Sequence, residues 1–187
     1  MARRLLREER GITVVEVMVA AVLMVVGVIA MITTFDGSRD LVTTSEKSGI
    51  AAHRGQLEVE KALSLDYRNI ALTSTPAPSG SSSSPDYYVN SDGTYQWDQS
   101  SSPKPADPMV VDSSDGALVH VSTWNDGESR LSGSIYRYVT WIDDPHVPGT
   151  QNAKRITVAV TVNNARAGGA LDKPVIVSSI AFDPKAG

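Results

Sequence analysis

Apolar residues are concentrated in one continuous stretch near the N-terminus. From Ile12 to Ile32 the only polar side chains are those of Thr13 and Glu16. This stretch has 21 residues, close to the ~20 that a helix needs to cross a bilayer. A single segment in lipid must satisfy its own backbone hydrogen bonds, which favours a helix. We therefore predict a membrane-spanning helix over residues 12–34.

Charged residues flank this stretch unevenly. Four Arg lie within residues 1–11, whereas the first basic residue beyond the stretch is Arg39. Basic residues beside a membrane helix favour the cytoplasmic side, so we expect a cytoplasmic N-terminus and an extracytoplasmic remainder. A cleaved secretory signal would have a shorter apolar core. A plain signal anchor fits the length but gives no reason for Glu16, because a carboxylate there costs about 2.5–3.5 kcal/mol on insertion scales.

Residues 35–72 continue with a helical period and mixed charge. The first Pro is Pro76, so one continuous helix from about Ile12 to Leu65 is compatible with the sequence. We expect its apolar side to pack against the C-terminal part of the chain, since no heptad pattern persists as in a coiled coil. The glycines at 27, 37, 49 and 55 are candidate bends. The predicted apolar positions are Val42, Ile50, Leu57, Leu63 and Tyr67.

Residues 73–108 have a different composition. Ser and Pro make up 16 of these 36 residues, a composition that cannot form a core and predicts a surface loop. Four aromatic residues interrupt the loop, and they form either an adhesive patch or anchors that hold the loop on the remainder of the fold. We favour anchoring. The four are Tyr87, Tyr88, Tyr95 and Trp97.

Beyond Pro108 the apolar period changes to two. In the stretch from Ile156 to Val162, Ile and Val alternate with Thr and Ala, which predicts a strand with one apolar face. Consecutive strands without helical segments between them predict an antiparallel sheet. Its apolar face would be covered by the outer half of the long helix, which gives an α+β fold. The predicted strands are Met109–Asp112, Ala117–Trp124, Ile135–Ile142, Arg155–Val162 and Val175–Phe182.

Composition excludes several classes of function. The chain has no Cys, which excludes disulfides, thiolate zinc sites and Cys nucleophiles. It has 17 basic and 21 acidic residues, a net charge of -4 that disfavours nucleic-acid binding. A local basic patch is conceivable from Arg130, Arg137, Lys154, Arg155 and Arg166. We expect no nucleic-acid partner.

Sequence motifs give no support for catalysis. The three His occur in separate segments without metal-ligand spacing, and neither a G-x-S-x-G nor a phosphate-binding loop is present. Four Asp at predicted loop ends are candidate calcium ligands, but EF-hand spacing is absent, which favours solvated turn residues. We expect no metal, no cofactor and no enzymatic activity. The residues concerned are His53, His120, His146, Asp112, Asp115, Asp143 and Asp144.

The start of the apolar stretch carries a specific motif. It reads Arg10-Gly11-Ile12-Thr13-Val14-Val15-Glu16 and follows a short basic segment. This resembles the cleavage site of type IV prepilins and pseudopilins, in which a basic leader ends in Gly and Glu is the fifth residue of the mature chain. Ile12 stands where Phe is usual, and Val14 where Leu is usual. The resemblance implies cleavage by a prepilin peptidase between Gly11 and Ile12, N-methylation of Ile12, and assembly roles for Thr13 and Glu16.

The same resemblance implies an architecture and a role. The fold would be pilin-like, with a long N-terminal helix, membrane-spanning in its first half, packed on an antiparallel β-sheet head. The chain would be a minor type IV pilin or pseudopilin subunit in the cell membrane and then in a surface filament. Its partners would be other pilin subunits, the prepilin peptidase, the assembly platform and the bilayer. The alternative is a single-pass, membrane-anchored surface binding protein that does not polymerise.

The expected parts of the chain follow from these observations. They are a basic leader over 1–11, a transmembrane and assembly helix over 12–34, the outer half of the helix over 35–72, a Ser/Pro-rich surface loop over 73–108 and a β head over 109–187.

Overall fold

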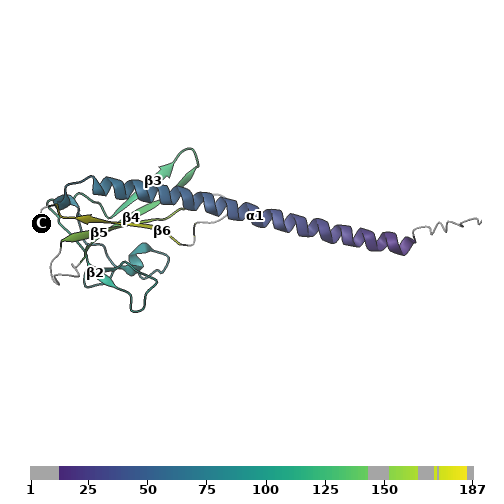
Figure 1. The fold of residues 1–187 in the computed structure, drawn as a ribbon, viewed down its shortest axis with the longest axis horizontal. Coiled ribbons are helices and arrows are strands. Elements are labelled where there is room, and N and C mark those ends of the chain that lie inside the picture. Colours follow the sequence, from purple (N-terminus) through teal and green to yellow (C-terminus); the bar gives the residue numbers. More distant parts are fainter. Residues whose placement is uncertain (1–12, 143–151, 164–170, 172, 185–187) are drawn as a thin grey trace, which may run out of the picture. The chain divides into compact units, whose positions relative to one another are not determined.

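The structure is a computed structural model that describes residues 13–142, 152–163, 171 and 173–184. It has an α+β fold, with one long N-terminal helix and antiparallel sheets, as the sequence predicts (Figure 1). The chain forms two compact units, whose boundary lies within the helix after Val42. The elements are α1 (Val14–Leu63), two short 3-10 helices η1 (Tyr67–Asn69) and η2 (Pro85–Tyr88), and strands β1 (Thr94–Gln96), β2 (Ala106–Pro108), β3 (Val121–Asp126), β4 (Leu131–Ile142), β5 (Ala153–Val160) and β6 (Val175–Phe182).

Helix α1 begins and ends close to the predicted positions. The glycines at 27, 37, 49 and 55 all lie within it. The helix ends at Leu63, where the Ser64 hydroxyl donates to the Lys61 carbonyl at 2.7 Å. The last part of the expected segment 35–72 is therefore not α-helical, and it contains η1 instead.

The larger sheet contains four antiparallel strands in the order β3-β4-β5-β6. Strands β4, β5 and β6 correspond to predicted strands, and Val139 pairs with Ile156 across the central pair. The expected strand over Met109–Asp112 is wrong. This stretch makes single bridges to different partners, from Met109 to Thr140 and from Val111 to Leu72, so no continuous ladder forms.

The packed side of α1 differs from the predicted apolar stripe. The residues of α1 buried against the sheet are mostly small: Ala51, Gly55, Val59 and Ala62, with Lys47. By contrast, Val42 and Leu63 are exposed. A Cβ built on Gly55 would lie 2.8 Å from Cγ2 of Val177 on β6, so small residues face the sheet because the helix backbone approaches it closely.

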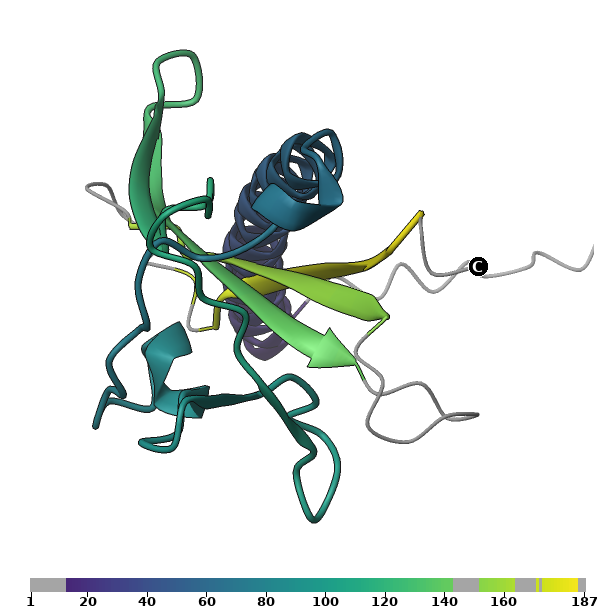
Figure 2. The same cartoon turned by 90° about the vertical axis from the view of Figure 1, so that its left-hand side faces the viewer.

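The second face of the sheet is covered as well, by residues 73–108 (Figure 2). The prediction of a plain surface loop is therefore wrong: this segment contains η2, β1 and β2, and Tyr95 is 1% exposed. The Tyr95 ring stacks on Tyr138 of β4 at 4.0 Å, which confirms the anchoring hypothesis for this aromatic residue. Tyr87, in contrast, is exposed.

Strand β5 is consequently buried on both faces. Val158 faces the core that includes α1, whereas Ala159 belongs to the smaller core around Tyr95 and Tyr138. The expectation of a single apolar face was wrong because Ala and Thr are small enough to be covered by the aromatic side chains of another segment.

Candidate functional site

The first unit presents an apolar helix surface without a protein partner. Between Val14 and Phe35 the only charged side chain is Glu16. Every described residue of this unit, from 13 to 42, is exposed in the single chain. Near its N-terminus α1 is long and apolar enough to cross a membrane. An exposed apolar surface of this extent requires lipid or other protein to cover it.

Polar side chains within this unit bond to their own helix. The Thr33 and Thr34 hydroxyls both donate to the Ala30 carbonyl at 2.9 Å, and the Ser38 hydroxyl donates to the Thr34 carbonyl at 2.9 Å. Side-chain donors that are satisfied within the helix need no water, which suits an apolar environment.

Thr13 and Glu16 meet at the start of α1. The Thr13 hydroxyl oxygen accepts a hydrogen bond of 3.3 Å from the Glu16 backbone N–H, which makes Thr13 the N-cap of the helix. A carboxylate in the first turn is also favoured by the helix dipole. These two predicted assembly residues therefore have a local role at the helix start. Gly11 and Ile12, the predicted cleavage and methylation positions, lie outside the described residues.

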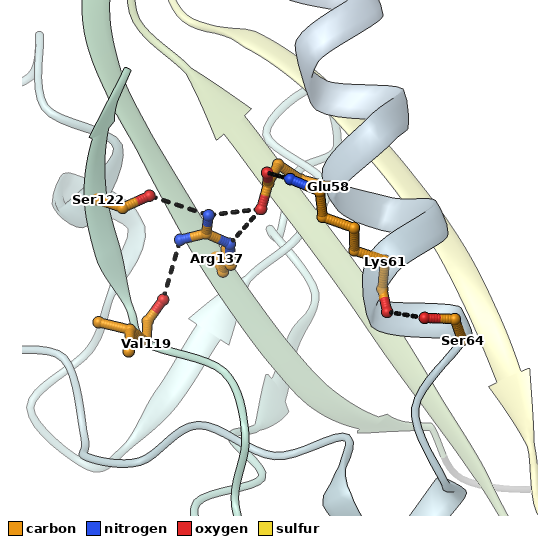
Figure 3. Close-up of polar contacts among 6 residues, drawn as sticks. All are labelled: Glu58, Lys61, Ser64, Val119, Ser122 and Arg137. Atoms are coloured by element: carbon orange, nitrogen blue, oxygen red, sulfur yellow. Dashed lines mark hydrogen bonds and ion pairs between the residues drawn. The ribbon is translucent and has the colours of Figure 1, made fainter. Parts of the chain in front are cut away.

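In the second unit, α1 and the sheet are joined by an ion pair that the sequence pattern did not reveal. Arg137 interrupts the apolar alternation of β4. Its Nε donates to Glu58 Oε2 at 3.0 Å, and both side chains are largely buried (Figure 3). Its remaining nitrogens donate to the Val119 carbonyl at 3.1 Å and to the Ser122 hydroxyl at 2.9 Å.

Glu58 accepts from α1 as well. Lys61 Nζ donates to its Oε1 at 2.6 Å, one helical turn away. Burial raises the pKa of Glu58, but the hydrogen bonds from Lys61 and Arg137 outweigh it and hold the pKa below its ordinary value. An Arg on an otherwise apolar strand face and a Glu on the packed side of a helix were the only sequence signals of this pair.

Of the other predicted basic residues, Arg155 and Lys154 have partners within the fold, whereas Arg130 is exposed. Arg155 donates to Asp107 at 2.8 Å, and its guanidinium lies 3.5 Å from the ring centroid of Trp97. Lys154 is buried and donates to the Tyr67 carbonyl at 2.8 Å. Arg166 lies outside the described residues. Among the described residues, Arg137, Lys154 and Arg155 therefore do not form a free basic patch.

Metal-ligand candidates are not gathered either in the part of the chain that is described. Asp112 closes a turn, where its Oδ1 accepts from the Ser114 backbone N–H at 2.9 Å and the Ser114 hydroxyl at 2.7 Å. These bonds lower the pKa of Asp112 to about 2. Asp143, Asp144 and His146 lie outside the described residues.

The second unit also has an open groove of about 970 Å³ near the end of the described chain. Trp141 and Tyr67 provide its aromatic walls, and Asp112 and Asp183 are among its acidic lining residues. Such a groove is large enough for a small ligand.

Comparison with known proteins gave no match: no protein-family model, no curated protein and no solved structure matches this chain.

Proposed function

We propose that this chain is a minor type IV pilin or pseudopilin subunit, cleaved after Gly11 by a prepilin peptidase and assembled through α1 into a surface filament. The observation that carries the proposal is the fully exposed apolar surface from Val14 to Phe35, with Glu16 as its single charge. The motif around Gly11 supports it independently, because it precedes this surface directly.

The mechanism follows from what can cover that surface. In the membrane, lipid covers the apolar side chains of α1. In a filament, the corresponding helices of other subunits would replace the lipid by van der Waals packing. The chain would therefore be held in the bilayer as a pool of subunits and move into the filament without exposing these side chains to water.

Glu16 gives this packing its register. Cleavage after Gly11 creates an ammonium group at Ile12, and methylation leaves its charge in place. An unpaired charge among apolar helices is costly, so a carboxylate from a neighbouring subunit would be its partner. The ion pair offsets the free-energy cost of desolvating the two charges, and it forms at only one axial position of the neighbouring subunit. The apolar contacts supply the favourable free energy of assembly.

The second unit would be the extracytoplasmic head, with no enzymatic role and no cofactor. The alternative is a membrane-anchored binding protein that does not polymerise, and the groove beside Trp141 favours it specifically. Both functions use the same membrane helix, but only the first requires cleavage after Gly11 and a partner for Glu16.

Processing is tested by the Gly11→Val variant in the native host. A branched side chain beside the scissile bond should block the peptidase, so the membrane pool should retain residues 1–11. Gly37→Val is the matched control, because a Cβ at Gly37 meets nothing within 4 Å. Intact mass of both variants is the measurement. Normal maturation of Gly11→Val would show that the cleavage assignment is wrong.

Assembly is tested by Glu16→Val. This variant should enter the membrane and be cleaved normally, since it removes a costly charge from an apolar helix. It should lose most of its incorporation into sheared filaments relative to the membrane pool. Glu16→Asp should be intermediate because its arm is shorter, and Glu46→Val, at an exposed position of the second unit, is the control. Wild-type incorporation of Glu16→Val would show that assembly does not depend on an ion pair of Glu16, whereas absence of the wild-type chain from sheared filaments would favour the anchored binding protein.

A further inference from the structure

Three polar side chains join the 73–108 segment to the sheet. Asp86 lies in η2, and its backbone N–H donates to the Ser84 hydroxyl, which caps this short helix. The Tyr138 hydroxyl of β4 donates to Asp86 Oδ1 at 2.6 Å. His120, directly before β3, places Nε2 at 2.9 Å from the same oxygen.

The second ring nitrogen of His120 also faces an acceptor. Nδ1 lies 3.0 Å from the Arg137 carbonyl oxygen. A carbonyl oxygen only accepts, and so does an ionised carboxylate, whereas a neutral imidazole has a single N–H. Both contacts are hydrogen bonds only if the ring carries two protons, as an imidazolium facing the Asp86 carboxylate. If the proton between Nε2 and Oδ1 is instead bonded to Asp86, the carboxyl donates to Nε2, and the two groups still share one proton.

The surroundings keep this pair away from solvent. The His120 and Asp86 side chains are 14% and 18% exposed. Tyr136 and Tyr138 of β4 face the imidazole ring edge-on at 5.9 and 5.2 Å, and Tyr95 stacks behind Tyr138. The guanidinium of Arg137 bonds to Glu58, so only the backbone of this residue contributes here. Charge-assisted hydrogen bonds in such a site are stronger than neutral ones.

We propose that Asp86, His120 and Tyr138 form a proton-dependent clasp that holds residues 73–108 against the sheet and opens when the imidazole loses its second proton. Deprotonation would leave Asp86 with the Tyr138 hydroxyl as its remaining side-chain donor and would turn a ring lone pair toward the carboxylate. The segment would then be held by Tyr95 and its neighbours without the charged contact.

Asp86 determines the lowest pH at which the clasp is closed. Burial raises the pKa of Asp86, but the hydrogen bonds from His120 and Tyr138 outweigh it, so the net pKa is lowered. A carboxyl whose folded pKa is depressed stabilises the fold above its unfolded pKa and loses that contribution as pH falls through the folded pKa. The clasp is therefore closed only at a pH above the folded pKa of Asp86.

The proton count is tested on the full wild-type chain in detergent micelles. The chain has three His, so ¹⁵N-histidine labelling gives three pairs of ring signals, and the pair missing from His120→Gln is assigned to His120. Because both ring nitrogens face acceptors, we expect both His120 nitrogens to carry protons that are coupled across hydrogen bonds. An unprotonated nitrogen in the wild-type ring, with Asp86 ionised, would overturn the clasp.

Opening is tested by amide hydrogen exchange. The Val89 and Asn90 amides donate within the segment, to Asp86 and Thr94 carbonyls at 3.1 and 2.9 Å. When the pH is raised, their protection factors should fall at least about tenfold, which corresponds to the loss of one charge-assisted hydrogen bond. His53→Gln, at an exposed position of α1, should behave like the wild type. His120→Gln, which keeps a donor but does not titrate, should show no such fall. Equal pH dependence in both variants would contradict the proposal.

Discussion

The two halves of α1 present opposite kinds of surface. From Val14 to Val42 large apolar side chains point in all directions and none is covered by the chain itself. From Thr43 to Leu63 the buried positions are mainly Ala, Gly and Val, while charged residues occupy much of the remaining surface. One continuous helix therefore combines a segment suited to lipid or other helices with a segment suited to one particular sheet.

The difference shows that apolar content is a poor guide to packing within a chain. The half with many Val, Leu and Met contributes no described residue to the intramolecular core, whereas a Cβ at Gly55 would lie only 2.8 Å from Val177 of β6. Size determines which residues face the sheet, because a close helix–sheet contact leaves no room for long side chains. Uniform hydrophobicity around a helix indicates a surrounding medium, and a narrow line of small residues indicates a specific neighbour.

The largest expected effect comes from placing the same substitution, Val to Asp, in each of the two units and comparing their stability. Val160 is fully buried, so Val160→Asp places a carboxylate in the core without a partner, at a cost of several kcal/mol. The second unit should lose cooperative unfolding. Val25→Asp should leave that transition unchanged, because Val25 is exposed and belongs to the first unit.

The measurement is chemical denaturation of the full chain in detergent, followed by Trp fluorescence. Val25→Asp should instead reduce membrane insertion, by about 2.5–3.5 kcal/mol on insertion scales. A cooperative Val160→Asp variant with an unchanged midpoint would show that Val160 does not lie in the core between the sheet and α1.

A smaller effect on stability is expected from the ion pair between Glu58 and Arg137, which involves only the C-terminal half of α1. Glu58→Gln leaves the largely buried Arg137 without its charged partner and should destabilise the second unit by about 1–3 kcal/mol. The folded pKa of Glu58 is lowered, so its contribution is present above the unfolded pKa and is lost as pH falls through the folded pKa.

The difference in unfolding free energy between wild type and Glu58→Gln should therefore shrink on acidification below about pH 4.5, near the ordinary Glu pKa. Glu60→Gln, at an exposed position two residues away, is the control and should change stability by no more than about 0.5 kcal/mol. A pH-independent difference would mean that Glu58 does not act through its charge.

The smallest expected effect compares two glycines of α1. Gly55→Leu introduces a side chain where a Cβ already meets Val177 at 2.8 Å, and overpacking costs about 1–3 kcal/mol. Gly49→Leu meets nothing within 4 Å and should stabilise by about 0.5–1 kcal/mol through helix propensity. Opposite signs in thermal unfolding support the close approach, and stabilisation by both would place the packed side of α1 elsewhere.

Sequence reasoning was most successful where local pattern decides the structure. The long helix follows from the apolar stretch and the absence of Pro before Pro76. Strands β4, β5 and β6 follow from their period of two. The expected strand at Met109–Asp112 failed because its residues find different partners from one position to the next. The motif at Gly11 and Ile12 stays a prediction, since both residues lie outside the described part of the chain.

The sequence by itself determined the helix, strands β4, β5 and β6 and the uncovered apolar surface, because these depend on neighbours within a few residues. Only the tertiary structure decided that Ser- and Pro-rich residues 73–108 cover a sheet face, that Arg137 meets Glu58, and that His120 meets Asp86. Glu58 and Arg137 are 79 positions apart, and His120 and Asp86 are 34 apart. Such pairs form only when distant segments fold against each other, so no local periodicity encodes them.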